Sequence, residues 1–216
     1  MSATKRKLYI VGAGSFGREL VSWIRFDAPG WTEFEFAGFL EDDSEALRNY
    51  PEYVPGVAAR TDEYQPHEGD GLVMGIADPK IKLEVASRLE ARGAKFLTFQ
   101  HPSVILARHV KLGRGVVLCP NSVVSCHAQL GDFVAVNIGC TVGHDAQLGA
   151  GCTLSAHVDI TGFAKLGEGV FLGSHASILP RAKVGAFARI GAGTVVLRRV
   201  DAGATVMGVP AKQVLP

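Results

Sequence analysis

The sequence lacks any apolar run that approaches the about 20 residues needed to cross a bilayer. It also lacks a secretory signal at its start, because residues 1–7 are polar and lead directly into a strand-like segment. A signal would place an apolar stretch and a small-residue cleavage site there. We therefore expect a cytoplasmic protein without a membrane span.

An excess of charge of either sign is missing too. The 216 residues include 22 Lys and Arg against 21 Asp and Glu, which leaves a net charge of +1. This balance gives no reason to expect nucleic acid or an anionic membrane as the main partner. Cysteine is scarce, and none of the four positions forms a C-x-x-C pair, so neither a zinc knuckle nor a redox motif is indicated. We expect no metal, and reduced thiols at Cys119, Cys126, Cys140 and Cys152.

Residues 1–100 predict an α/β domain. Short apolar strands are expected at residues 7–11, 34–40, 71–76 and 96–99, and helices at residues 18–27 and 79–92. Asp78 and Pro79 suit the N-cap and the first position of the second helix, which Gly93 would end. Strands that alternate with helices favour a parallel sheet with βαβ crossovers, so we expect a Rossmann-like domain.

Residues 101–216 follow a different rule, because an aliphatic residue recurs at every sixth position. This column contains Leu106, Leu112, Leu118, Val124, Leu130, Val136, Val142, Leu148, Leu154, Ile160, Leu166, Leu172, Ile178, Val184, Ile190 and Val196. Four residues after each of them lies a small or β-branched residue, from Val110 to Val200. A six-residue period is typical of a parallel β-helix, in which three hexads form one triangular coil. Such coils stack at the ordinary strand spacing of about 4.8 Å.

Repeats of the Leu-Gly-x-x-Ala-x type, together with the segment Gly208–Lys212, resemble those of the hexapeptide-repeat acyltransferases. This resemblance implies a left-handed coil, an exception to the usual right-handed crossover. The sequence G-x-G-x-x-G-R-E at residues 12–19 is similar to that of sugar acetyltransferases that modify amino groups of nucleotide-linked sugars. Bacillosamine and perosamine N-acetyltransferases are of this kind, and sialic acid O-acetyltransferases share the layout.

The resemblance implies an acetyl-CoA-dependent N-acetyltransferase of polysaccharide biosynthesis. Residues 1–100 would bind the nucleotide-sugar acceptor, and residues 101–216 would carry out acyl transfer. A homotrimer with its active site between subunits is also implied, and it would bury the flat apolar faces of a triangular prism. Two departures stand out: Ser15-Phe16-Gly17 replaces the Gly-His-Gly of the family's loop, and Thr153 stands where some relatives carry a second histidine.

Asn137 and the pair His144-Asp145 fit the family's Asn-x6-His-(Glu/Asp) pattern. Acetyl transfer to an amine requires a base, and a neutral histidine suits this task because its pKa lies near working pH. We expect His144 to be that base and Asp145 to fix its tautomer, although Asp145 has an alternative partner in His127, one coil below. Asn137 would bind the sugar or its amine, or would only form a corner of the coil.

The glycine loop is the expected acceptor site. Gly12, Gly14 and Gly17 follow a strand and open a helix, an arrangement that can hold a diphosphate on backbone N–H groups. The other expected contacts are Ser15, Phe16, Glu41, Asp42, Asp78 and Lys80. An acidic residue after the second strand would meet a ribose hydroxyl. The alternative is a tight turn without a ligand.

Coenzyme A is expected in a groove along the later coils. Residues eighteen apart should stack, which places the side-chain-free Gly162 above His144 and leaves a gap for the pantetheine arm. Gly173 and Gly191 would also allow a close approach of the backbone, and Arg198 or Lys212 would meet the phosphates. Tight corners and solvated charges are the alternative explanation.

Three other functions fit parts of this pattern. A sugar O-acetyltransferase would have the same fold and base. A γ-type carbonic anhydrase needs three histidines that converge on zinc, which the spacings among His127, His144, His157 and His175 do not supply. A non-catalytic nucleotide-sugar-binding protein would not need Asn137, His144 and Asp145 together. The sequence does not name the sugar or its nucleotide.

Overall fold

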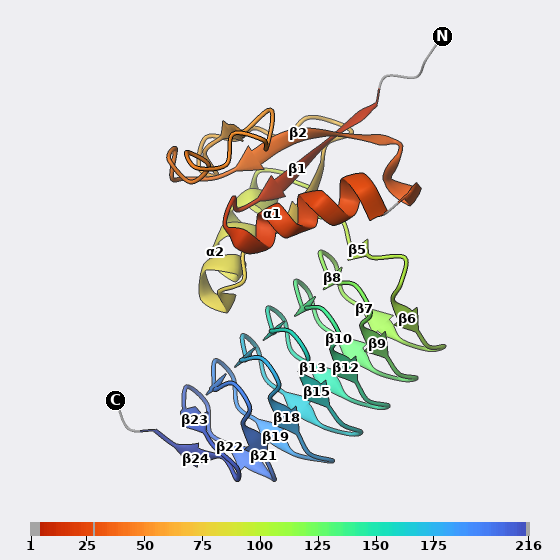
Figure 1. Ribbon diagram of the computed structural model, residues 1–216, viewed down its shortest axis with the longest axis vertical. Helices are drawn as coiled ribbons and strands as arrows, with labels where there is room; N and C mark the ends of the chain where they lie inside the picture. Colours follow the sequence, from red (N-terminus) through yellow and green to blue (C-terminus); the bar gives the residue numbers. More distant parts are fainter. Residues whose placement is uncertain (1–4, 28, 215–216) are drawn as a thin grey trace.

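The change of pattern near residue 100 becomes a change of architecture in the computed structural model, which describes residues 5–27 and 29–214 (Figure 1). A small sheet with two helices lies along one side of a column of stacked triangular coils. Residues 1–4, part of the polar stretch used above to predict a cytoplasmic location, lie outside the described residues. Among the described residues no helix is long and apolar enough to span a membrane.

The N-terminal sheet has four parallel strands in the order β3-β2-β1-β4. They are β1 (Arg6–Val11), β2 (Phe34–Leu40), β3 (Val57–Ala59) and β4 (Gly71–Met74). Three of them confirm predicted strands, whereas β3 was missed because it is short and only half-buried. The fourth predicted strand is not continuous: Phe96 makes an isolated bridge with Leu72, and Phe99 begins a strand of the column.

Two α-helices pack on this sheet. α1 (Ser15–Ser22) begins at the N-cap Gly14 and continues into a π-helical turn, η1 (Trp23–Asp27), followed by a 3-10 turn, η2 (Pro29–Trp31). α2 (Pro79–Ala91) has the predicted start, since the Asp78 carboxylate accepts hydrogen bonds from two N–H groups of its first turn. Two helices do not establish the doubly wound arrangement that a Rossmann-like domain implies.

The column consists of short strands, one on each side of each coil, all of them parallel except the last, which pairs antiparallel with the strand before it. They are β5 (Phe99–Gln100), β6 (Ile105–Leu106), β7 (Lys111–Leu112), β8 (Val117–Leu118), β9 (Val123–Val124), β10 (Gln129–Leu130), β11 (Ala135–Val136), β12 (Thr141–Val142), β13 (Gln147–Leu148), β14 (Thr153–Leu154), β15 (Asp159–Ile160), β16 (Lys165–Leu166), β17 (Phe171–Leu172), β18 (Ser177–Ile178), β19 (Lys183–Val184), β20 (Arg189–Ile190), β21 (Val195–Val196), β22 (Arg199–Val200), β23 (Thr205–Met207) and β24 (Lys212–Gln213). These strands form three sheets, of six, eight and six strands.

The predicted β-helix is confirmed as a β-solenoid, and its form is consistent with a left-handed coil. Leu154 pairs with Val136 below and Leu172 above, each eighteen residues away, as the hexads predict. The aliphatic column is buried from Leu118 to Val196, whereas Leu106 is 37% exposed at the open end of the stack. The coils therefore share one continuous apolar axis.

The last coil departs from the hexad rule. Val200 pairs with Val184, only sixteen residues earlier, so the final coil is two residues shorter than the others. Val200 thus occupies an axial position, whereas the sequence pattern assigned it to the column of small residues. The aliphatic side chain remains buried at 5% exposure, so the apolar axis continues through the shortened coil.

The eight-stranded side of the column faces the N-terminal half. Val117 and Ala135, which point outward from this side, are buried in one cluster with Leu8 and Ile10 of β1. β5 belongs to this side as well, because Phe99 pairs with Val117 of β8. The two halves therefore meet across a packed apolar wall.

Candidate active site

His144 and Asp145 lie together at the corner between β12 and β13. The Nδ1 atom of His144 is 2.9 Å from Oδ2 of Asp145, and the imidazole side chain is 55% exposed. The left-handed backbone of Asp145, with φ of 59°, turns the chain at this corner. If Nδ1–H donates to the carboxylate, Nε2 keeps a lone pair and can accept a proton.

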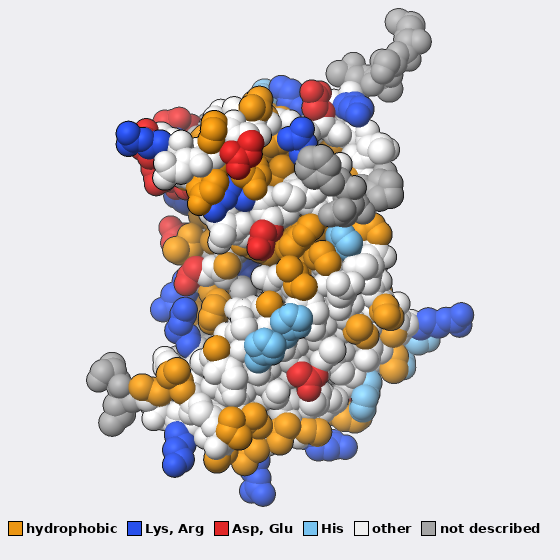
Figure 2. Space-filling view, viewed as in Figure 1, with side chains coloured by type: hydrophobic (Ala, Val, Ile, Leu, Met, Phe, Trp, Pro, Cys, Tyr) orange, Lys and Arg blue, Asp and Glu red, His pale blue; other side chains and the backbone are white. Residues whose placement is uncertain are grey.

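The alternative partner of Asp145 is engaged elsewhere. His127 stacks on His109 with ring centroids 5.1 Å apart, and His157 stacks on His175 at 5.0 Å. Both pairs are separated by one coil, as the eighteen-residue period predicts, and histidines are visible on the surface of the coils in Figure 2. Within the described residues no group of three or more His, Cys, Asp or Glu could hold a metal ion.

Gly162 lies above His144 as predicted, but the space over it is filled. A Cβ atom added there would lie 2.6 Å from Nε2 of His144, so the imidazole itself occupies the expected gap for pantetheine. The ring also contacts the edge of Phe163, with centroids 5.1 Å apart. Gly162 therefore makes room for the proposed base within one chain.

A cavity of about 270 Å³ lies between the N-terminal half and the eight-stranded side of the column. Its lining residues are Ser15, Phe16, Glu19, Ala77, Ala135, Asn137, Thr153, Leu154, Ser155 and Phe171. The structure thus brings Ser15, Phe16 and Asn137 together, as expected for an acceptor site. His144 is not among these lining residues and lies at another corner of the coil, so one chain does not unite the base with this cavity.

The side-chain amide of Asn137 has an NH₂ group available at the cavity wall. Its Oδ1 accepts a hydrogen bond of 2.7 Å from the Ile138 N–H, which leaves the side-chain NH₂ group as a donor. The left-handed position of this corner is taken by Gly139, with φ of 64°. The alternative reading of Asn137, as the residue that tolerates a left-handed corner, therefore loses its main support.

The glycines of the loop are required by close packing. Gly12 has φ of 96°, and a Cβ atom on Gly17 would lie 1.9 Å from the Gly12 carbonyl oxygen. Gly14 differs, since the space around it is open and α1 has no side-chain cap. Its first turn therefore presents backbone N–H groups that an anion could accept.

The two acidic residues after β2 are engaged within the domain. Glu41 accepts a hydrogen bond of 2.8 Å from the Ala13 N–H, so a carboxylate of the chain itself already lies against the glycine loop. Asp42 accepts from both the backbone N–H and the hydroxyl of Thr61, each at 2.8 Å. These contacts order the loop, and a diphosphate would have to bind toward Gly14 rather than at Ala13.

Asp78 and Lys80 lie beside the cavity, whose wall includes their neighbour Ala77. Asp78 caps α2 and also reaches the column, where its Oδ2 is 3.6 Å from a guanidinium nitrogen of Arg189. The Lys80 ammonium lies 6.0 Å from the ring centre of Phe187. Both side chains thus connect the two halves.

The residues expected to bind coenzyme A are spread over the later coils. A Cβ atom on Gly173 would lie 2.6 Å from the Ala192 nitrogen, and one on Gly191 would lie 2.7 Å from Cγ of Met207. These glycines are therefore closely packed rather than open, which agrees with the alternative of tight corners. Arg198 and Lys212 are exposed.

A carboxylate in the cavity and a buried cation were not predicted from the sequence. Glu19 lines the cavity, and burial raises the pKa of its carboxyl group above the usual value. Lys82 is fully buried, and burial lowers the pKa of its ammonium group to about 7. A signal did exist for Lys82, because it shares the buried face of α2 with Val85, Ala86 and Leu89.

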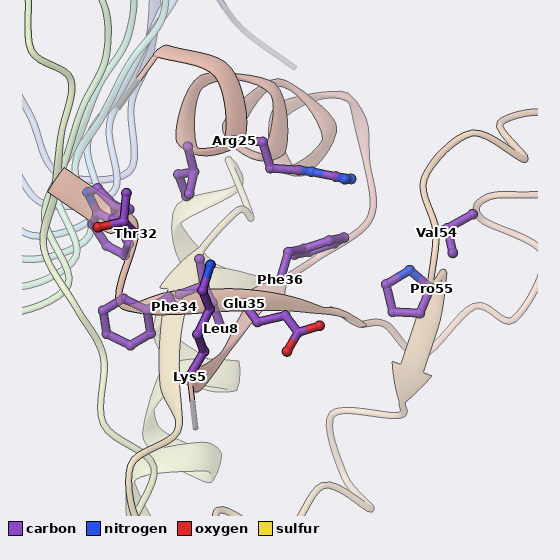
Figure 3. Close-up of a pocket in the computed structure, with 11 residues that line it drawn as sticks. Lys5, Leu8, Arg25, Thr32, Phe34, Glu35, Phe36, Val54 and Pro55 are labelled. Atoms are coloured by element: carbon purple, nitrogen blue, oxygen red, sulfur yellow. The ribbon is translucent and has the colours of Figure 1, made fainter. Parts of the chain in front are cut away.

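A larger hollow of about 840 Å³ lies elsewhere, beside the first residues of β1 and β2 (Figure 3). It is lined by Lys5, Leu8, Ile24, Arg25, Trp31, Thr32, Phe34, Glu35, Phe36, Val54 and Pro55. None of these residues belongs to the site predicted from the sequence. The smaller cavity therefore remains the candidate site, because it gathers three of the predicted residues.

No family model and no curated protein matches the chain. Solved structures do match. PerB from Caulobacter crescentus, in complex with CoA and GDP-perosamine, is 27% identical over 96% of each chain, with a TM-score of 0.84. The acetyltransferase domain of PglB from Neisseria gonorrhoeae, in complex with acetyl coenzyme A, is 27% identical over 97% of this chain and 100% of that chain, also with a TM-score of 0.84.

A third match is a perosamine N-acetyltransferase from Caulobacter crescentus in which one histidine is replaced by asparagine. It is 25% identical over 97% of each chain, has a TM-score of 0.85 and contains CoA and GDP-perosamine. All three matches are hexapeptide-repeat sugar acetyltransferases. They confirm the resemblance that the repeats and the glycine-rich loop indicated.

Proposed function

We propose that this chain, an acyltransferase related in structure to the hexapeptide-repeat sugar acetyltransferases, transfers an acetyl group from acetyl-CoA to the amino group of a nucleotide-linked amino sugar. The cavity between the two halves carries the proposal, since it joins the start of α1 to Asn137 of the column. The similar enzyme PerB was crystallised with CoA and GDP-perosamine, a donor and an acceptor of these classes.

The lining of the cavity suits an amine. Glu19 supplies a carboxylate, and burial raises its pKa, so a cationic or hydrogen-bonding amino group would be a favourable partner for it. The Asn137 amide and the Ser155 side chain, one coil above, add polar groups on the opposite wall. A hydroxyl acceptor would gain less from Glu19, and for this reason we favour N-acetylation over O-acetylation.

The nucleotide would lie over residues 1–100, the proposed acceptor-binding domain. The open first turn of α1 at Gly14, Ser15 and Phe16 offers N–H groups and the positive end of a helix dipole to a diphosphate. We propose that Glu41 and Asp42 meet the ribose side of the nucleotide, since they end the neighbouring strand. Asp78 and Lys80 would border the sugar.

His144 would perform the proton transfer. The acceptor nitrogen attacks the thioester carbonyl, the N–C bond forms, the C–S bond breaks, and the amine proton passes to Nε2 of His144. The departing thiolate of coenzyme A then takes up a proton. Asp145, 2.9 Å from Nδ1, holds the imidazole in the tautomer that leaves Nε2 free.

A homotrimer would unite the base and the cavity. His144 of one chain lies at a different corner from the cavity of the same chain, so we propose that a neighbouring chain supplies the imidazole. Coenzyme A would lie along residues 101–216, a left-handed β-helix in this proposal. Its contacts would include the exposed side chains of Arg198 and Lys212. Gly162, Gly173 and Gly191 are closely packed and would border it only through their backbone.

The first test is a transfer assay in the presence of acetyl-CoA. The acceptors are GDP-, UDP-, TDP- and CMP-linked amino sugars, each beside its counterpart with a hydroxyl in place of the amine. We expect release of free thiol with one amino sugar and an amide product that resists hydroxylamine. An ester product would favour an O-acetyltransferase, and the absence of transfer to every acceptor would favour a binding protein.

A second test addresses the shared site by mixing His144→Ala with Asn137→Ala at an acceptor concentration well below KM, where both variants are impaired. In randomly assembled mixed trimers, about a quarter of the interfaces would combine an intact base with an intact cavity. We expect the mixture to regain about that share of the wild-type rate. A mixture no more active than its parts, with subunit exchange shown by mass, would place both residues within one chain's site.

A further inference from the structure

Lys82 presents an unusual arrangement, because a fully buried ammonium group lies between α2 and the column. Its Nζ atom donates to the Phe133 carbonyl at 3.1 Å, the Gly151 carbonyl at 3.3 Å and the Thr153 hydroxyl oxygen at 2.7 Å. All three acceptors are uncharged and belong to the column. Burying a cation on neutral acceptors costs free energy, so the arrangement needs a reason beyond packing.

Thr153 connects this cation to the candidate site. Its hydroxyl donates to the Ala77 carbonyl at 2.7 Å while its oxygen accepts from Lys82. Thr153 and Ala77 both line the cavity, Thr153 from β14 of the column and Ala77 from the loop before α2. One chain of hydrogen bonds, from Lys82 through Thr153 to Ala77, therefore joins the two walls of the cavity.

The number of hydrogens defines the state of this network. A hydroxyl has one proton, and that of Thr153 is used toward Ala77, so its oxygen can only accept from Lys82. Nζ then faces three acceptors and needs all three protons of the ammonium form. A neutral amine has only two N–H donors and would leave one acceptor unpaired.

We propose that Lys82 is a positioning residue for the acetyl acceptor: it fixes Thr153 and the Ala77 backbone, and thereby holds the two walls of the cavity at the spacing that the acceptor requires. The inference rests on the function proposed above. Lys82 does not touch substrate, because its side chain has no exposed surface. Its effect passes through Thr153.

The charge on Lys82 depends on its surroundings. Burial lowers the pKa of Lys82 to about 7, while the carboxylate of the nearby Asp78 acts to raise it. Asp78 also contacts Arg189, and burial raises the pKa of the Cys152 thiol to about 12, so this thiol stays neutral. The network in its ammonium form is thus expected to weaken as the pH rises through about 7.

The experiment compares Thr153→Val with Thr153→Ser, which keeps the hydroxyl and serves as the matched control. Steady-state kinetics are measured with the acceptor and with acetyl-CoA as the varied substrate. We expect Thr153→Val to raise the KM for the acceptor about tenfold, because the hydroxyl that joins Lys82 to the Ala77 carbonyl is lost. The KM for acetyl-CoA should stay within about twofold of wild type, and Thr153→Ser should stay close to wild type for both substrates.

Lys82→Met tests the cation itself, with the double variant Lys82→Met/Thr153→Val. Because both residues act in one network, their effects on the acceptor KM should be less than additive. The wild-type acceptor KM should also rise more steeply above pH 7 than that of Lys82→Met. If Lys82→Met does not fold, the Thr153 pair decides the question.

Two results would overturn the inference. One is an active wild type whose acceptor KM is unchanged in Thr153→Val. The other is a loss of kcat with equal effects on both KM values and on the melting temperature, the pattern of a purely structural contact. A wild type that transfers acetyl to no acceptor would instead reject the proposed function, and this inference with it.

Discussion

The two halves of the molecule build their surfaces in different ways. In the column, every coil repeats the same axial contacts, so neighbouring coils differ mainly in the residues at their corners and on their outer sides. In the N-terminal half, each contact occurs once, as in the hydrogen bond between Glu41 and the Ala13 N–H. The regular half can therefore vary its outer residues at little cost to the fold, while the irregular half cannot.

We expect the column and the place where the two halves meet to serve different steps of the reaction. The proposed base stands at a corner of the column, with Gly162 leaving room for its ring. Acceptor recognition would depend on the place where the irregular half meets the column, at the cavity that includes Ser15 and Asn137. Substitutions in the two places should thus alter different kinetic constants.

The largest expected effect is on kcat, from His144→Ala. Loss of general base catalysis typically lowers kcat by about 10²–10⁴. His109→Ala is the matched control, since His109 is also a corner histidine but stacks only on His127 in the first coils. Activity of His144→Ala close to that of wild type, or an equal loss in the control, would remove the assignment of the base.

The next effect is on the stability of the column. Leu154 is fully buried on the axis, so Leu154→Ala should lower the free energy of unfolding by about 2–5 kcal/mol. Leu106→Ala, at a 37% exposed position of the same repeat, should cost clearly less. Urea unfolding measures both. If both substitutions lower the free energy of unfolding equally, the burial of the individual side chain does not determine its contribution to stability.

Acceptor recognition should show a smaller change. Asn137→Ala removes an amide donor from the cavity wall and should raise the acceptor KM about tenfold in steady-state kinetics, with little change for acetyl-CoA. Asn121→Gly is the control, because Asn121 is a corner residue with φ of 58°, where glycine fits the backbone. An unchanged acceptor KM in Asn137→Ala would argue that Asn137 only shapes the coil.

The most gradual expected effect is a pH dependence of stability. The pKa of Lys82 is about 7 in the folded protein against an ordinary value of 10.5, so between these values the unfolded chain binds more protons than the folded one. Stability should therefore rise with pH above about 7, by at most about 1.4 kcal/mol per pH unit. Unfolding of wild type and Lys82→Met at pH 6 to 9 measures it. If the difference in the free energy of unfolding between wild type and Lys82→Met does not change with pH, the lowered pKa is contradicted.

The sequence predicted the column well and the N-terminal half less well. The hexads gave the stacking of Leu154 on Val136 and of His127 on His109, because a fixed period repeats the same local information in every coil. The short strand β3 was missed, and the predicted strand at residues 96–99 is not continuous. Strand pairing in the N-terminal half depends on tertiary contacts that occur only once. Phe99 pairs with Val117 of the column instead of with the N-terminal sheet.

The candidate site also has a part that the sequence predicted and a part that it did not. The motif led to the pair of His144 and Asp145, which are neighbours in the chain and confirmed to be in contact. It gave no indication that Glu19 shares a cavity with Asn137. Residues so far apart in the sequence meet only through the docking of the two halves.

By itself, the sequence determined that residues 101–196 wind into stacked coils and which residues occupy the corners, because a period of six leaves one way to bury the aliphatic column. Only the tertiary structure decided which side of the column is covered. Docking buried Lys82 beyond the reach of water and set Thr153 against Ala77. Desolvation acts on groups brought together from distant positions, so the helical spacing that puts Lys82 on the buried face of α2 does not reveal what it is buried against.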